Sequence, residues 1–257
     1  MNINDNTTKP IFIEIYFNET KLSTATGFAI LHQNKKYLVT NWHVVSGRNF
    51  ITKECLSKTA AIPNKLILRF KKYINHTQFE WIEQEVNLFD ENENKLWHEH
   101  PKYGSKVDVV LIMIEDKLES IYPLEYFRIN SSCELNITEK LFVLGFPLGY
   151  IVKSRNEPYA IWTSGTIASE PSLNLVINNE EVPAFLIDSR TGSGQSGSPV
   201  IYYSLSGIDS NHSNGFTMWG GPIMREVGIY SGRIDKDSDL GYVWKWSVIQ
   251  DIINSIK

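Results

Sequence analysis

The sequence predicts an all-β protein, either a barrel or a sandwich, with one short helix near its C-terminal end. Segments of about four to eight residues, rich in β-branched and aromatic side chains, recur between Gly, Pro, Asn and Asp clusters. Long stretches with helical periodicity are almost absent, so a regular alternation of strands and helices is excluded. The 257 residues, of which 42% are hydrophobic and 21% charged, suffice for one large domain or two smaller halves that share an interface.

Predicted strands occur in both halves of the chain. The clearest are residues 11–17, 26–31, 65–70, 107–114, 140–144 and 184–188. The polar run at residues 90–95 predicts a hairpin tip or a surface insertion in the first half. Between Leu118 and Thr138 the strand pattern weakens and turn residues appear, which indicates a connector between the halves.

The C-terminal residues have the periodicity of a helix. Ser247 is a suitable N-cap, because it lies just before a stripe of apolar residues at helical spacing. The stripe consists of Val248, Ile249, Ile252, Ile253 and Ile256. We therefore expect a short terminal helix that packs on the barrel through this stripe.

Charge and hydropathy exclude two classes of partner. The formal net charge is −4 and the basic residues are scattered, whereas proteins that bind nucleic acid usually carry a basic face. Apolar stretches such as residues 109–114 are about a third of the roughly 20 residues that a membrane-spanning helix needs. We therefore expect neither nucleic acid nor a membrane as a partner.

The N-terminal residues predict a cytoplasmic location. Residues 1–6 contain neither a basic start nor a following apolar run, so no secretory signal is visible. A secreted protein whose leader had been replaced by an initiator Met would have the same sequence, and this alternative stays open.

Cysteine and histidine residues form no recognisable metal or redox motif. Cys55 and Cys133 lack CxxC spacing and are predicted to be free, buried thiols. His98 and His100, with His76 not far away in sequence, lack the Cys or carboxylate partners that would complete a tetrahedral site. We therefore expect no metal and no cofactor.

A flexible loop at residues 192–199 carries the sharpest local signal. Its sequence is Gly-Ser-Gly-Gln-Ser-Gly-Ser-Pro, and an apolar strand follows at residues 200–203. Acyl transfer needs a hydroxyl beside backbone N–H groups that converge on the developing oxyanion, and a glycine before the nucleophile leaves that space free. Ser196 is therefore the candidate nucleophile, and the N–H groups of Gly194 and Ser196 form the candidate oxyanion hole.

A base and an acid that orients it have candidates in the first half. A serine hydroxyl is a weak nucleophile, so the chain must supply both groups. His43 directly follows a predicted strand, which can hold its ring. Asp108 opens an apolar strand, where a buried carboxylate needs a hydrogen-bond donor such as an imidazole N–H.

Three motifs in this chain resemble the triad motifs of trypsin-like serine proteases. They are Thr-Asn-Trp-His-Val-Val around His43, Asp-Val-Val-Leu-Ile from Asp108, and Gly-Gln-Ser-Gly-Ser-Pro-Val around Ser196. They also occur in that family's order, His, Asp, Ser. Smaller similarities at residues 26–28, 145–149, 164–167 and 228–232 extend the resemblance over about Thr26 to Val243.

The resemblance implies two six-stranded antiparallel β-barrels of the chymotrypsin type. A flexible N-terminus would cover residues 1–10, the first barrel residues 11–122 and a connector residues 123–138. The second barrel would cover residues 139–246, and the C-terminal helix residues 247–257. His43 and Asp108 would lie in the first barrel and Ser196 in the second, with the site in the cleft between them.

Gln195 bears on how such an enzyme would be activated. Digestive members of the family carry Asp at this position, where it pairs with a new N-terminal amine after zymogen cleavage, and Gln cannot form that ion pair. Gln195 and Ser198 resemble the bacterial glutamyl-endopeptidase and HtrA-like branches, and we expect no appended PDZ domain. The enzyme is therefore predicted to be either active as made or gated by a protein partner or a loop rearrangement.

By analogy with the family, the strand that contains Ser231 and Gly232 would bind the substrate. Its backbone would face the substrate chain, and the Ser231 hydroxyl would support Asp108. The substrate would be a protein or a peptide.

Two arginines are candidates for the primary specificity pocket. Arg190 lies six residues before Ser196, a position that in the family often lines the base of that pocket, and Arg233 follows the Ser231 strand. Two guanidinium groups would favour cleavage after Glu or Asp. Each arginine has an equally plausible structural role, either paired with a carboxylate such as Asp188 or facing solvent.

Two other functions were weighed against a serine endopeptidase. An α/β-hydrolase expects GxSxG on a strand-to-helix elbow and the order Ser, acid, His, whereas a strand follows Ser196 and the order here is the opposite. A catalytically silent protease-like domain that binds a protein partner in the cleft stays open, because sequence does not reveal the geometry of the oxyanion loop.

Overall fold

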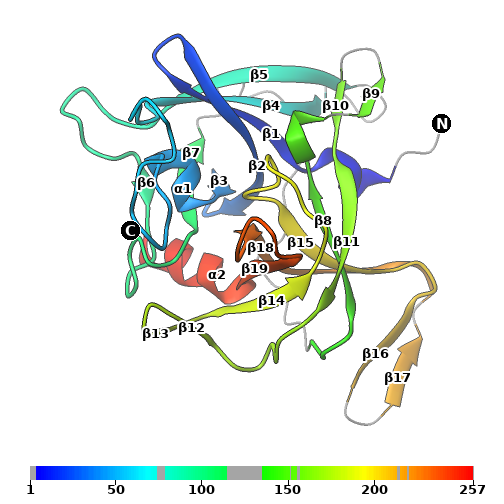
Figure 1. The fold of residues 1–257 in the computed structure, drawn as a ribbon. Coiled ribbons are helices and arrows are strands. Elements are labelled where there is room, and N and C mark those ends of the chain that lie inside the picture. Colours follow the sequence, from blue (N-terminus) through cyan, green and yellow to red (C-terminus); the bar gives the residue numbers. More distant parts are fainter. Residues whose placement is uncertain are drawn as a thin grey trace.

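A computed structural model describes residues 4–73, 79–114, 135–150, 152–154, 157–212, 215–218 and 220–256. Two β-rich halves are packed against each other, and Figure 1 shows the first half, coloured blue to green, above the second, coloured green to orange. All the strand pairs are antiparallel. The all-β chymotrypsin-like fold predicted from the sequence is therefore confirmed.

The first half is a seven-stranded sheet with the order β5-β4-β1-β2-β3-β7-β6. The strands are β1 (Ile11–Phe17), β2 (Thr20–His32), β3 (Lys35–Thr40), β4 (Lys65–Tyr73), β5 (Phe79–Asn87), β6 (Trp97–His98) and β7 (Val110–Ile114). The prediction of six strands is wrong here, because β6 adds two residues to the edge of β7. The two ends of the sheet approach each other where the Leu96 N–H donates to the Leu88 carbonyl at 3.0 Å.

The second half is a closed barrel of six strands, as predicted. Its order is β11-β14-β19-β18-β15-β8. The strands are β8 (Lys140–Gly145), β11 (Ile161–Ile167), β14 (Ala184–Asp188), β15 (Pro199–Ser204), β18 (Ile223–Arg233) and β19 (Leu240–Lys245). Three hairpins extend from it, formed by β9 (Val152–Ser154) and β10 (Glu157–Tyr159), β12 (Leu175–Ile177) and β13 (Glu180–Val182), and β16 (Ile208–His212) and β17 (Gly215–Met218).

One apolar cluster joins the two halves and the C-terminal helix. Strands β2, β3 and β7 contribute to it from the first half, β8, β15 and β18 from the second, and the helix adds its apolar face. Its fully buried members include Phe28, Val39, Leu111, Leu144, Ile201, Ile229, Val248 and Ile252. Burying each such side chain contributes about 1.5–3 kcal/mol, so the cluster fixes the relative position of the halves and of any site between them.

The C-terminal helix, α2 (Trp246–Ser255), begins one residue earlier than predicted. Lys245 occupies the N-cap position without a side-chain hydrogen bond, and Ser247 lies inside the first turn, so the predicted Ser247 cap is wrong. The reason is packing: Trp246 is buried and stacks on Phe28, with ring centroids 5.8 Å apart. The predicted apolar stripe is buried as far as Ile253.

The N-terminal segment, predicted to be flexible, contains a short 3-10 helix, η1 (Asp5–Thr8). Thr7 anchors it to the second barrel, because its hydroxyl accepts from the Trp162 indole at 3.0 Å and its carbonyl accepts from the Ala160 N–H at 3.1 Å. These two bonds hold the segment against the second barrel.

Several other predictions are tested by the described residues. The polar run at 90–95 is an exposed turn, as predicted, in which the Asp90 carboxylate accepts from the backbone N–H groups of Asn92 and Asn94. Cys55 is a free thiol, as predicted, but only partly buried. Cys133, His76 and most of the predicted connector lie outside the described residues. No helix of the described part has both the length and the apolar character needed to cross a membrane.

Candidate active site

His43 is held by a short helix that directly follows a strand of the first half. Strand β3 ends at Thr40, and α1 (Trp42–Ser46) begins two residues later. Gly47 ends the helix in the left-handed conformation, with φ of 65°. Because Trp42 and Val44 on either side are buried, the backbone of His43 is fixed while its side chain remains 18% exposed.

Asp108 binds His43 twice. Its Oδ1 accepts from the His43 backbone N–H at 2.8 Å, and its Oδ2 lies 2.6 Å from His43 Nδ1. The Asn41 side-chain amide donates to the Asp108 carbonyl at 2.7 Å and fixes the backbone of the acid. A carboxylate is only an acceptor, so Nδ1 carries the proton and Nε2 is left as the basic nitrogen of the ring.

Ser231 connects the acid with the candidate nucleophile. Its hydroxyl donates to Oδ2 of Asp108, as predicted, and its carbonyl accepts from the Ser196 hydroxyl at 3.0 Å. Asp108 is fully buried, and its three donors satisfy the carboxylate in that position. The Ser196 hydroxyl is therefore bonded to the second half and not to His43.

The Ser196 loop is fixed to β18 by a pair of backbone hydrogen bonds. The Gly197 N–H donates to the Tyr230 carbonyl and the Tyr230 N–H donates to the Ser198 carbonyl, both at 2.9 Å. Gly197 has φ of 87°, and a Cβ there would lie 2.0 Å from the carbonyl oxygen of Thr26. Only glycine permits this close approach of the two halves beside Ser196.

The buried side chain of Gln195 links the Ser196 loop to β11 of the second barrel. Its side-chain oxygen accepts from the Gly192 N–H at 2.8 Å, and its side-chain amide donates to the Thr163 hydroxyl at 2.9 Å. The residue is fully buried. A neutral side chain thus stabilises the loop with hydrogen bonds of its own, without an ion pair.

Thr26, on β2, connects the first half to this loop. Its N–H donates to the Ser196 carbonyl at 2.8 Å, and its hydroxyl donates to the Gly194 carbonyl at 2.8 Å. The same hydroxyl accepts from the Phe146 N–H at 3.2 Å, and the Thr26 carbonyl accepts from the Thr40 hydroxyl at 2.9 Å. Thr26 is fully buried, so these bonds are shielded from water.

A hydrogen bond to the Ser193 carbonyl sets the orientation of the peptide before Gly194. The Ser193 carbonyl accepts from the Leu148 N–H, at the end of the short turn η2 (Pro147–Gly149). In a trans peptide the C=O and N–H point in opposite directions, so the Gly194 N–H points away from this turn. Among the described residues, neither the Gly194 nor the Ser196 N–H has a hydrogen-bond acceptor, and both are available for an anion.

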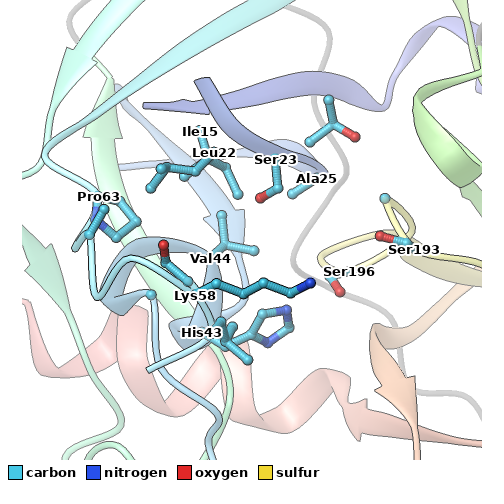
Figure 2. A pocket seen from close by; sticks show the side chains of 16 residues that line it. Ile15, Leu22, Ser23, Ala25, His43, Val44, Lys58, Pro63, Ser193 and Ser196 are labelled. Atoms are coloured by element: carbon cyan, nitrogen blue, oxygen red, sulfur yellow. The ribbon is translucent and has the colours of Figure 1, made fainter. Parts of the chain in front are cut away.

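A pocket of about 430 Å³ lies between His43 and the Ser196 loop. Figure 2 shows the His43 ring and the Ser196 side chain facing it from the two halves, with the Lys58 side chain extending across it. The wall on the first half is mainly apolar, and its members include Ile15, Leu22, Ala25, Val44, Leu56 and Pro63. The described residues thus bring His43, Gly194 and Ser196 to one cavity, with the buried Asp108 hydrogen-bonded to His43.

A match to a protein-family model identifies the family to which this chain belongs. The model of the trypsin-like peptidase domain matches residues 25–204, more than half of the chain. The chain belongs to the trypsin-like peptidase family. It is a serine endopeptidase, a hydrolase that acts on proteins or peptides.

Solved structures similar to this peptidase share its fold at low sequence identity. Protease Anisep from Arthrobacter nicotinovorans has 14% identity and a TM-score of 0.54, over 97% of this chain and 95% of that chain. The active form of the Rv3671c protease from M. tuberculosis has 16% identity and a TM-score of 0.51, over 97% of this chain and 81% of that chain. The serine endoprotease from Yersinia pestis has 13% identity and a TM-score of 0.52, over 97% of this chain and 64% of that chain. A search of curated proteins gave no match.

The arginines predicted to line the specificity pocket of the peptidase lie at its surface. The Arg190 side chain is 91% exposed, with its Nε 3.8 Å from Oδ2 of Asp239. Arg233 is exposed as well. Arg190 thus has the alternative, structural role: it faces solvent and lies near a carboxylate, which is that of Asp239 and not of Asp188.

Tyr230 occupies the space beneath the Ser196 loop of the peptidase. Its hydroxyl is hydrogen-bonded to that of Thr191, and its ring packs so closely on Gly241 that a Cβ there would lie 2.5 Å from it. Burial raises the pKa of Tyr230 to about 12, although the bond to Thr191 acts in the opposite direction. Sequence reasoning missed this residue, because an aromatic side chain in an apolar strand has no distinguishing pattern.

His100, one of the histidines considered for a metal site, has a structural role. His100 is buried, with Nε2 3.3 Å from Oδ2 of Asp251, and its Nδ1 accepts from the backbone N–H groups of Lys102 and Tyr103. Burial lowers the pKa of both His98 and His100. Within the described ranges, no group of three or more His, Cys, Asp or Glu side chains is placed to hold a metal ion.

Proposed function

We propose that the peptidase cleaves peptide bonds through Ser196 as nucleophile, His43 as general base and Asp108 as the residue that orients the base. The observation that carries this proposal is the doubly bonded His43–Asp108 pair, which leaves Nε2 basic in the pocket that Ser196 also lines. Rotation about the Ser196 Cα–Cβ bond releases its hydroxyl from the Ser231 carbonyl and makes it available to Nε2. Such bonds are often poorly aligned before substrate binds.

The reaction proceeds in two halves. His43 Nε2 takes the proton from Ser196 Oγ as Oγ bonds to the carbonyl carbon, and the N–H groups of Gly194 and Ser196 stabilise the oxyanion. When the tetrahedral intermediate collapses, the C–N bond breaks and His43 gives its proton to the leaving amine. The ester on Ser196 is the acyl-enzyme. Water then attacks it with His43 again as base, which releases the acid and restores the Ser196 hydroxyl.

We further propose that the peptidase is active as made. Gln195 stabilises the loop through Gly192 and Thr163, and the Gly194 and Ser196 N–H groups already lack acceptors in the described residues. Both features support a formed oxyanion hole that needs neither a new N-terminal amine nor a protein partner. Activity that appears only after a partner is added would favour the gated alternative.

One observation favours a second function, a catalytically silent domain that binds a partner in the cleft. The Ser196 hydroxyl donates to Ser231 and not to His43. If that bond persisted with a peptide bound, the nucleophile would stay unactivated. Hydrolysis of any peptide by the purified protein would exclude this function.

The test is the Ser196→Ala variant, assayed with a mixture of unstructured peptides and analysis of the products by mass spectrometry. Loss of the nucleophile should lower turnover by on the order of 10⁴ to 10⁶ without unfolding the protein. Ser172→Ala is the matched control, because its exposed hydroxyl bonds only to Glu170. Equal hydrolysis by the Ser196→Ala variant and the wild type would remove Ser196 from the mechanism.

A further inference from the structure

The pocket beside His43 lies on the side of the scissile bond from which the amine leaves. His43 must protonate that amine, so the segment after the scissile bond passes close to its ring. The pocket is built from His43, from residues 22–25 and 56–58 of the first half, and from Ser193, Gly194 and Ser196. The strand from Ser231 to Arg233, whose backbone is predicted to face the substrate chain, does not line it. The pocket is therefore placed to receive side chains of the leaving segment.

This pocket has a positive charge and no acid in its wall. Of the described residues that line it, Lys58 is the only lysine or arginine, and none is Asp or Glu. Lys58 is exposed and, among the described residues, forms neither a hydrogen bond nor an ion pair. Figure 2 shows its side chain crossing the pocket toward the side where Ser196 lies.

The surroundings of Lys58 favour a carboxylate over a neutral group. Apolar side chains such as Leu56 and Val44 form the wall against which a lysine stem or a substrate methylene chain can pack. An ammonium group pairs well with a carboxylate, and a charge-assisted bond is stronger beside an apolar wall than in open water. No acid of the pocket wall competes for the Lys58 charge.

We propose that Lys58 binds a carboxylate on the leaving segment of the substrate, so that the peptidase favours Asp or Glu at the first or second position after the scissile bond. This proposal rests on the Ser196 mechanism described above. The same chemistry can come from the free C-terminal carboxylate of a short leaving segment. Lys58 is thus a specificity-determining residue in a loop that no catalytic motif marks.

The experiment uses internally quenched peptides built on one sequence that the wild-type enzyme cleaves. In two pairs, Glu is compared with Gln at the first or at the second position after the scissile bond. In a third pair, a short leaving segment ends in a free carboxylate or in an amide. The expected result is a kcat/KM about five- to tenfold higher for the carboxylate member of at least one pair, as one charge-assisted contact gives.

Substitution identifies the residue responsible. In Lys58→Met the ratio of kcat/KM for the carboxylate peptide to kcat/KM for its neutral partner should fall to about one. In Lys58→Glu the carboxylate peptide should become the poorer substrate. Lys35→Met is the matched control, because Lys35 is an exposed lysine on β3 that does not line the pocket, and the ratio should stay at the wild-type value. The wild-type ratio should also fall as salt rises from about 0.05 to 1 M, because ions screen exposed charges.

The outcomes separate the two proposals. Equal kcat/KM for both members of every wild-type pair overturns the role of Lys58 while leaving the Ser196 mechanism intact. A wild-type preference that survives in Lys58→Met also overturns it. A preference confined to the third pair supports Lys58 as a ligand of the chain terminus instead of an acidic side chain. Failure to find any parent sequence that the wild type cleaves contradicts the Ser196 mechanism itself.

Discussion

Replacing Thr26 with valine removes a single hydroxyl from the boundary between the two halves, with little change in side-chain volume. That hydroxyl donates to the Gly194 carbonyl at 2.8 Å and accepts from the Phe146 N–H at 3.2 Å. Because Thr26 is fully buried, water cannot replace either bond. The variant therefore leaves one acceptor and one donor unsatisfied, and the acceptor belongs to the residue whose N–H forms half of the proposed oxyanion hole.

The expected loss of stability follows from the two groups left unsatisfied, the Gly194 carbonyl and the Phe146 N–H. An unsatisfied buried backbone group costs about 1–3 kcal/mol, and the Phe146 bond is the longer of the two. We therefore expect the free energy of unfolding to fall by about 2–4 kcal/mol. Loss of a complete oxyanion donor lowers kcat by about 10² to 10³. The N–H of Gly194 remains present but less well held, so kcat should fall by about 10- to 100-fold.

The assay combines urea unfolding with steady-state hydrolysis of one peptide. Thr26→Ser keeps the hydroxyl and loses only a methyl group, so its cost should stay near 1 kcal/mol and its kcat near the wild-type value. If Thr26→Val matches Thr26→Ser in both stability and kcat, the hydroxyl does not hold the oxyanion loop and the reasoning is refuted.

Two further predictions test the acid and the buried tyrosine. Asp108→Asn should lower turnover by about 10⁴, because the amide favours the wrong tautomer of His43; turnover close to wild type would mean that another acid orients the ring. Burial raises the pKa of Tyr230 to about 12, so the unfolded chain loses this proton first. The contribution to stability, about 3 kcal/mol, is present below pH 10 and is lost as pH rises through 12. Tyr230→Phe should remove this part of the pH dependence of unfolding, and parallel curves for variant and wild type would contradict it.

Much of the fold could be predicted from local sequence patterns. Strands β1 and β14 have the bounds that the sequence indicated, because each is a run of β-branched and aromatic residues with turn residues at its ends. Strand β6 could not be found, since two residues give no periodicity and the strand exists only through pairing with β7. The start of α2 was misplaced because Trp246 packs on Phe28, a tertiary contact that outweighs the capping preference of Ser247.

The candidate site was predictable where chemistry requires particular residues. His43, Asp108 and Ser196 stand in motifs, and the structure joins the first two directly. The direction in which Arg190 points was not predictable, since the exposure of a loop arginine depends on the tertiary packing around it. The position of the Lys58 side chain in the pocket was not predictable either, because a lysine in a polar loop has the same sequence pattern whether it faces a pocket or open solvent.

The most direct measurement of the central claim is the reaction of the purified protein with a fluorophosphonate, which modifies only a serine that a neighbouring base activates. The mechanism predicts one probe per chain, found by peptide mapping on Ser196, and no modification of Ser196→Ala. Failure of the wild type to react, or a probe found on a different serine, would contradict activation of Ser196 by His43.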